Sequence, residues 1–406
     1  PALGERSLQV QHEIAKAAAA GSWPAGSMEQ KVGDFFASGM DEAAIEAAGL
    51  SPIQSELDAI AALTATSDIP AFLGKSYANG QGMLFSFFAM ADYNDSTTNI
   101  AYAGQGGLSL PERAYYLEDR EDYKQARAAF LDHVTKLLVL AGTDEATAAA
   151  QAQVVLDFET RLAKASLGRL ELRDPATRYN PVTLAEADAM TPNFQWTAFF
   201  ADLGVAAPEK FSLANPNFFK EFDAMLADVP LEQWQTWLRF RAIDGAAPYL
   251  SKAFVERNFE FYAKTLRGQQ EQQERWKQVL GALNGSMGEG FGQLYVAQAF
   301  PPESKAKMEE LVANLMAALK VRLENLEWMS DETKAKAIEK WSSFTPKIGY
   351  PDVWRDWSGL EVKRDSYAGN LMAASAFNYR YMLDKIGKPV DRSEWGMSPQ
   401  TVNAYY

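Results

Sequence analysis

The 406-residue sequence contains no cysteine. Disulfide bonds and thiolate metal sites are therefore excluded for this chain. The lack of thiols fits a protein of the reducing cytosol and equally an exported bacterial protein, so it does not assign a compartment. A chain of this length can bury enough apolar surface to fold without a covalent or metal crosslink.

Histidine is almost as rare, since the chain has only His12 and His133. A zinc site of the His-Glu-x-x-His type needs two imidazoles four residues apart on one helix, with the glutamate beside the bound water. His12 and Glu13 begin in this way, but Lys16 stands where the second histidine is needed. We therefore expect both histidines to be packing or surface residues, and no catalytic or metal-binding residue within this chain.

Long apolar runs and basic clusters are also missing. No stretch approaches the roughly 20 apolar residues that cross a bilayer. The 39 Lys and Arg residues are outnumbered by 53 Asp and Glu residues, giving a net charge of −14. Without a basic stripe, a nucleic-acid partner is not expected. Because the chain starts at Pro1 rather than at a methionine, any targeting segment is expected upstream.

Short motifs for other chemistries are weak. The glycine-rich residues 79–82 and 104–107 lack the Lys-Ser/Thr pair of a phosphate-binding loop and are interpreted as turns. Carboxylate groups that could be paired as acid and base are expected to be solvated faces or helix caps. They are Asp92 with Asp95, and Glu303 with Glu309 and Glu310.

The patterns that are present are mostly helical. Apolar residues recur at helical spacing over residues 30–48, 55–63, 121–141 and 144–167, with Gly49 as an expected C-cap. Two later helices are expected after Pro301 and after Ser330, and Met308, Leu311, Leu315 and Leu319 line one face of the first. Residues 83–90 could be a strand or a buried helical turn. After Phe344 the sequence becomes rich in Pro, Gly and Trp, which indicates a crossing between lobes.

Several longer strings are more specific. In chain order they are 106–113 (GGLSLPER), 115–117 (YYL), 159–163 (ETRLA), 173–175 (RDP), 300–302 (FPP), 328–330 (WMS), 347–352 (KIGYPD), 387–392 (GKPVDR) and 397–406 (MSPQTVNAYY). This ordered series resembles the neprilysin family of zinc metallopeptidases. Animal relatives have a cysteine near the position of Gly39, so the lack of cysteine suggests a bacterial member.

The resemblance implies a mainly α fold, with an irregular multi-helix cap lobe over residues 1–344. Residues 345–406 would then be the crossing segment and the first part of a thermolysin-like catalytic lobe, ending at the substrate-binding strand. Within that strand, Asn403 and Ala404 match the positions that hold the backbone of a peptide substrate. The family's His-Glu-x-x-His helix and its third zinc ligand follow this strand, so zinc and its ligands are expected beyond Tyr406.

Three functional interpretations follow. In the first, the chain is the N-terminal part of a zinc peptidase for small peptides, inactive alone and partnered by its own C-terminal catalytic fragment. In the second, it is a non-enzymatic binding or scaffold module derived from the cap lobe. The first predicts a large exposed apolar patch where the catalytic part docks, and the second predicts a polar surface there. A third, a helical glycosidase, would need two inward carboxylates in one cleft. The resemblance favours export to the periplasm, with a cytoplasmic location as the alternative.

Overall fold

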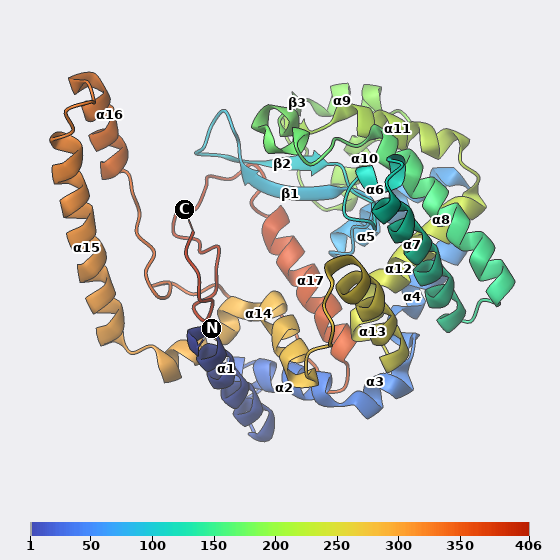
Figure 1. The fold of residues 1–406 in the computed structure, drawn as a ribbon, viewed down its shortest axis with the longest axis horizontal. Coiled ribbons are helices and arrows are strands. Elements are labelled where there is room, and N and C mark those ends of the chain that lie inside the picture. Colours follow the sequence, from blue (N-terminus) through green and yellow to red (C-terminus); the bar gives the residue numbers. More distant parts are fainter. Residues whose placement is uncertain (1, 406) are drawn as a thin grey trace. The chain divides into compact units, whose positions relative to one another are not determined.

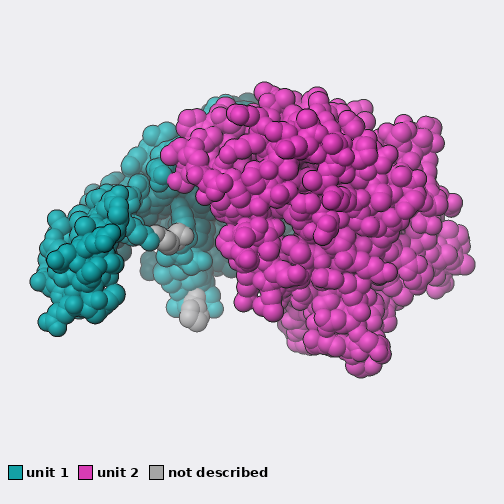
Figure 2. Space-filling model, turned by 90° about the horizontal axis from the view of Figure 1, so that it is seen from above, with its two compact units in different colours: residues 1–37, 275–361, 391–406 teal, residues 38–274, 362–390 magenta. Residues whose placement is uncertain are grey.

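The computed structural model describes residues 2–405, which form a mainly helical structure with one small sheet (Figure 1). This confirms the predicted fold class. The chain divides into two compact units (Figure 2). Unit 1 comprises residues 1–37, 275–361 and 391–406, and unit 2 comprises residues 38–274 and 362–390. The assignment of residues 1–344 and 345–406 to two lobes of the family fold is a separate question and stays a prediction.

Unit 2 holds most of the helices and the sheet. Its helices are α3 (Glu42–Ala48), α4 (Gln54–Ala61), α5 (Ile69–Ala78), α6 (Ala114–Leu117), α7 (Glu121–Leu140), α8 (Glu145–Ala165), α9 (Leu184–Met190), α10 (Trp196–Asp202), α11 (Pro216–Asp228), α12 (Leu231–Ala246), α13 (Lys252–Asn258), the π-helix η6 (Phe259–Thr265) and α17 (Tyr367–Leu383). Short 3-10 helices are η1 (Ser51–Ile53), η2 (Thr66–Asp68), η3 (Glu171–Arg173), η4 (Pro175–Arg178) and η5 (Ala247–Tyr249).

The sheet of unit 2 has the strand order β1-β2-β4-β3. Its strands are β1 (Ser86–Ala91), β2 (Asn99–Gly104), β3 (Pro181–Val182) and β4 (Phe211–Leu213). β1 pairs antiparallel with β2, β2 parallel with β4, and β4 antiparallel with β3. The apolar run at residues 83–90 is therefore mostly strand. Side chains on a strand alternate between its faces, which explains why Phe87 is buried while its neighbour Phe88 is 38% exposed.

Most predicted helices of unit 2 are present within two residues of their expected ends. The prediction of a single helix over residues 30–48 is wrong, because the helix is interrupted at Asp41, between α2 (Met28–Met40) and α3. The Asp41 carboxylate accepts a hydrogen bond from the backbone N–H of Ala44 and so caps α3. Such a cap satisfies a free N–H at a helix start, which competes with continuing the helix. The expected stop at Gly49 is confirmed by its φ of 51°.

Unit 1 is built from α1 (Ala2–Ala20), most of α2, α14 (Arg275–Ala299), α15 (Pro302–Glu324) and α16 (Asp331–Ser342). α1 packs against both α2 and α14. At Gly33 in α2 a Cβ would lie 2.4 Å from the carbonyl oxygen of Ala18, so only glycine permits that close approach. α14 contains a kink at Met287, whose φ of −145° is not helical.

α15 and α16 lie side by side and pack on each other (Figure 1). The indole of Trp341 on α16 donates to the backbone carbonyl of Met316 on α15 at 2.9 Å. The apolar face of α15 that the sequence predicts is exposed among the described residues. Its members and their exposed fractions are Met308 43%, Leu311 48%, Leu315 61% and Leu319 41%.

None of the helices in residues 2–405 combines the length and apolar character that a membrane-spanning helix needs.

Candidate functional site

The residues predicted to hold a substrate lie at the exposed C-terminal end of the described chain. Asn403 and Ala404 are both exposed, and residues 401–405 are in neither a helix nor a strand. Their hydrogen bonds are local: Asn403 N–H donates to the carbonyl of Thr401 at 3.1 Å, and Ala404 N–H donates to Asn403 Oδ1 at 2.8 Å. A strand needs a partner to pair with, and none of the described segments supplies one. The substrate-binding strand therefore stays a prediction.

This exposed segment follows a firmly held residue. Gln400 is only 5% exposed, and its side-chain Nε2 donates to Asn284 Oδ1 at 2.6 Å and to the carbonyl of Gly288 at 2.8 Å. Both acceptors lie on α14. A hollow of about 510 Å³ opens between α1, α14 and residues 398–402 of unit 1. Sequence reasoning placed Gln400 within a family string but missed its role as an anchor, because its partner lies 116 positions away.

The two histidines do not come together. His12 is half-buried on α1 and stacks on Trp276 with 4.1 Å between ring centroids. His133 is fully buried in unit 2, where its Nε2 lies 2.8 Å from Asp244 Oδ1. Both histidines are packed against other side chains in this structure.

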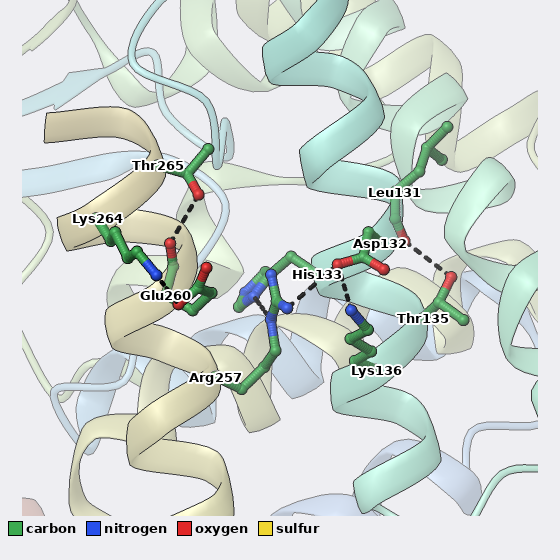
Figure 3. Close-up of polar contacts among 9 residues, drawn as sticks. All are labelled: Leu131, Asp132, His133, Thr135, Lys136, Arg257, Glu260, Lys264 and Thr265. Carbon is green, nitrogen blue, oxygen red and sulfur yellow. Dashed lines mark hydrogen bonds and ion pairs between the residues drawn. The ribbon is translucent and has the colours of Figure 1, made fainter. Parts of the chain in front are cut away.

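The hydrogen-bond partners of His133 also determine which of its ring nitrogens carries the proton. Arg257 Nε donates to His133 Nδ1 at 3.2 Å, while the same guanidinium donates to Asp132 (Figure 3). An arginine can only donate, so Nδ1 is the acceptor and Nε2 carries the proton that Asp244 accepts. Neither ring nitrogen of His133 is left to bind a metal.

The described residues do not fit zinc. Within residues 2–405 no three His, Asp or Glu side chains are grouped as a metal site would require. Structural zinc sites have four protein ligands and catalytic ones usually three.

The acidic groups have structural surroundings. Glu303, Glu309 and Glu310 are exposed on α15. Asp92 is buried; burial opposes its ionisation, but hydrogen bonds from Lys210 and Tyr179 outweigh this and hold its pKa below the usual value. These contacts make Asp92 the anchor of the β1–β2 turn.

Glu159 is a fully buried carboxylate on α8, and burial raises its pKa. Its two oxygens accept hydrogen bonds from the Ser109 N–H and hydroxyl, the Tyr116 hydroxyl and the Trp237 indole. Every favourable direction around it is occupied by a protein donor, so Glu159 joins elements of the core. No pair of carboxylates placed for glycoside hydrolysis is found among these acidic groups.

Comparison with known proteins defines the class. The family model described as "Peptidase family M13" matches residues 2–351. The chain is 30% identical to an endothelin-converting enzyme homolog of Locusta migratoria over 346 residues, which are 80% of this chain and 47% of the relative. It is also 30% identical to neprilysin-3 of Drosophila melanogaster over 345 residues, 80% of this chain and 43% of that one.

Comparison with solved structures gives the same class of protein. The structure of the zinc metalloprotease Zmp1 of Mycobacterium tuberculosis in its open state matches with a TM-score of 0.93 and 34% identity, over 100% of this chain and 63% of that one. A PepO structure from Lactobacillus rhamnosis, at 23% identity and a TM-score of 0.89, shows the same fold over 100% of this chain and 64% of that chain. The chain belongs to peptidase family M13, the family of neprilysin-like metallopeptidases. It spans about half the length of the curated relatives it matches.

Proposed function

We propose that this chain is the N-terminal part of a zinc-dependent peptidase that hydrolyses small peptides. In this proposal Asn403 and Ala404 hold the substrate, and polypeptide beyond Tyr406 supplies the zinc ligands and the glutamate that acts as general base. The observation that carries this proposal is the match of the peptidase family model to residues 2–351. The curated relatives are about twice as long as this chain. The lobes would be the predicted ones, residues 1–344 and 345–406.

The role of Asn403 and Ala404 rests on main-chain chemistry. An extended peptide can add to an exposed chain segment through backbone hydrogen bonds, whatever its side chains are. The Asn403 side chain offers both a carbonyl acceptor and an amide donor, so it can bind a peptide group from both sides. The exposure of Asn403 and Ala404 is compatible with this role.

The apolar face of α15 supports a missing partner. Met308, Leu311, Leu315 and Leu319 are each more than 40% exposed on one side of a single helix. A continuous apolar face of this kind typically marks an interaction site. We assign it to the C-terminal part of the same protein, because the matched relatives are about twice as long as this chain. A scaffold module that had lost the catalytic part would instead be expected to carry polar residues on this face.

Peptide hydrolysis by two forms of the protein tests the proposal. The full-length protein should cleave a short fluorogenic peptide, lose this activity to a chelator and regain it with zinc. Residues 1–406 purified alone should not cleave the peptide with or without zinc. Cleavage by residues 1–406 alone, or chelator-resistant cleavage by the full-length protein, would overturn the proposal. A full-length protein that binds peptides without cleaving them would favour the scaffold interpretation.

A further inference from the structure

Four polar side chains in unit 1 form a closed ring of hydrogen bonds. Gln400 Nε2 donates to Asn284 Oδ1 at 2.6 Å, and Asn284 Nδ2 donates to Gln11 Oε1 at 2.8 Å. Gln11 Nε2 then donates to Ser7 Oγ at 3.1 Å, and Ser7 Oγ donates to the backbone carbonyl of Gln400 at 3.0 Å. The ring therefore starts and ends on Gln400 and joins α1, α14 and the segment before Asn403.

The direction of every bond in the ring is fixed by backbone carbonyls, which can only accept. The Gln400 carbonyl requires Ser7 to donate, so Ser7 Oγ must accept from Gln11. At the opposite side of the ring, the carbonyls of Gly288 and Leu280 accept from Gln400 Nε2 and Asn284 Nδ2. These independent constraints require the same amide orientations. Hydrogen bonds that all run in one sense strengthen one another.

Three of the four ring members are buried, and Asn284 is half-buried at the hollow between α1 and α14. Ser7, Gln11 and Gln400 are exposed by 4%, 6% and 5% respectively. Buried polar groups usually need hydrogen bonds to compensate for lost water. Gln400 makes them with its amide nitrogen and its backbone carbonyl, while its Oε1 accepts no hydrogen bond from the described residues. The hydrogen bonds of the ring therefore form only while Gln400 stays in this position, because both its amide nitrogen and its backbone carbonyl belong to the ring.

α14 lies close to Pro399 and Gln400 at two glycines. A Cβ at Gly292 would lie 2.6 Å from Pro399 Cδ and 2.9 Å from Gln400 Oε1. Gly288, which accepts from Gln400, follows the non-helical Met287 directly. Kinks in helices occur where a side chain bonds to the helix backbone. The two glycines and the kink thus form a slot for the Gln400 amide.

We infer that Ser7, Gln11, Asn284 and Gln400 are positioning residues for peptide binding. This inference rests on the proposed function of Asn403 and Ala404. The ring fixes Gln400, and three residues of extended chain reach at most about 11 Å, so the position and direction of Asn403 are constrained while its side chain stays accessible. Preorganised segments bind ligands more tightly because less conformational freedom is lost on binding.

The test uses the full-length protein and a short peptide substrate. Gln400→Met keeps the volume of the side chain and removes its hydrogen bonds to Asn284 Oδ1 and the Gly288 carbonyl, which opens the ring. We expect KM to rise about tenfold with kcat changed by less than about threefold, as for loss of uniform binding. Amide hydrogen exchange at residues 401–405 should become faster while exchange in α15 is unchanged. Gln9→Met, an exposed position on the same helix as Gln11, is the matched control and should leave both measurements unchanged.

Two further variants separate the possible failures. Ser7→Ala removes the two ring bonds of the Ser7 hydroxyl, to the Gln400 carbonyl and from Gln11 Nε2, and keeps the Gln400 amide in place. It should give a smaller rise in KM of about threefold. Asn403→Ala tests the proposed function directly. If Asn403→Ala leaves KM unchanged, the proposed role of Asn403 in holding the substrate fails, and with it the basis of this inference. If Asn403→Ala raises KM but Gln400→Met and Ser7→Ala do not, only the positioning role is overturned.

Combining Gln400→Met with Asn403→Ala should raise KM by less than the product of the single effects, because the ring acts through Asn403.

Discussion

The side chains of Gln400 and Asn284 are joined by a 2.6 Å hydrogen bond across 116 positions of sequence. This bond connects the segment of predicted substrate contact to a kinked helix in the same compact unit. Its consequence is that the binding segment need not be rigid by itself. The fold holds one end of it, and Asn403 and Ala404 remain exposed beyond that point.

The slot in α14 predicts opposite outcomes for two glycines on one helix. Gly292→Ala should push residues 398–400 out of place, since the new methyl group would meet Pro399 at 2.6 Å. We expect KM of the full-length protein to rise several-fold. Gly281→Ala is the control, because no atom lies within 4 Å of its added Cβ. It should leave KM unchanged and stabilise the helix by up to about 1 kcal/mol. Equal KM values for both variants would contradict the slot.

The exposed apolar face of α15 predicts that a charge placed on it destabilises the full-length protein but not residues 1–406 alone. Leu315→Glu should have little effect on the stability of residues 1–406, where Leu315 is 61% exposed. In the full-length protein it should lower the free energy of unfolding by about 2–4 kcal/mol, if the C-terminal part buries this side chain. Ala317→Glu, exposed on the other side of α15, is the control and should be tolerated in both forms. Equal tolerance of Leu315→Glu in both forms would show that the face is not covered.

His133 is predicted to stabilise the fold and not to bind metal. His133→Ala removes a buried ring and leaves Asp244 and Arg257 without their imidazole partner. We expect unfolding to become easier by about 3 kcal/mol, measured by denaturant titration. The zinc content and KM of the folded full-length variant should be unchanged. A variant that folds normally but has lost zinc would contradict this assignment.

Asp92 predicts a pH dependence of stability. Its pKa is held below the usual aspartate value in the folded protein, because the bonds from Lys210 and Tyr179 outweigh the cost of burial. The carboxylate therefore stabilises the fold above its unfolded pKa, near 4, and this contribution is lost as the pH falls through the lower folded pKa. Asp92→Asn should destabilise the protein by about 1–3 kcal/mol at pH 7 and by much less at pH 3. Asp58→Asn, at an exposed position of α4, is the control for the change of charge alone. A pH-independent difference for Asp92→Asn would contradict the assigned ion pair.

Helices were the most predictable part of this structure. The periodic runs that became α7, α8, α15 and α16 carry their own boundaries in capping residues such as Asp144 and Ser330. The break at Asp41 was missed because the apolar spacing continues across it, and the cap that stops the helix is a single local hydrogen bond. The strand β1 could not be separated from a helix, since its identity depends on pairing with β2.

The candidate site likewise has a part that the sequence predicts and a part that depends on tertiary structure. The family strings predict that Asn403 and Ala404 contact the substrate, and this role remains a prediction. Nothing in the local sequence connects Gln400 with Ser7 or Asn284, because the ring forms only when three distant segments fold together. Likewise, periodicity predicts that α15 has an apolar face, but the exposure of that face is a tertiary property that the local sequence does not determine.

Zinc binding tests the central claim most directly. Residues 1–406 and the full-length protein would each be dialysed against the same low free-zinc concentration, and bound metal measured by atomic emission. The account predicts about one zinc ion per full-length molecule and none bound at that concentration by residues 1–406. One tightly bound zinc ion in residues 1–406 alone would mean that the metal centre is built from this chain, and would contradict the account.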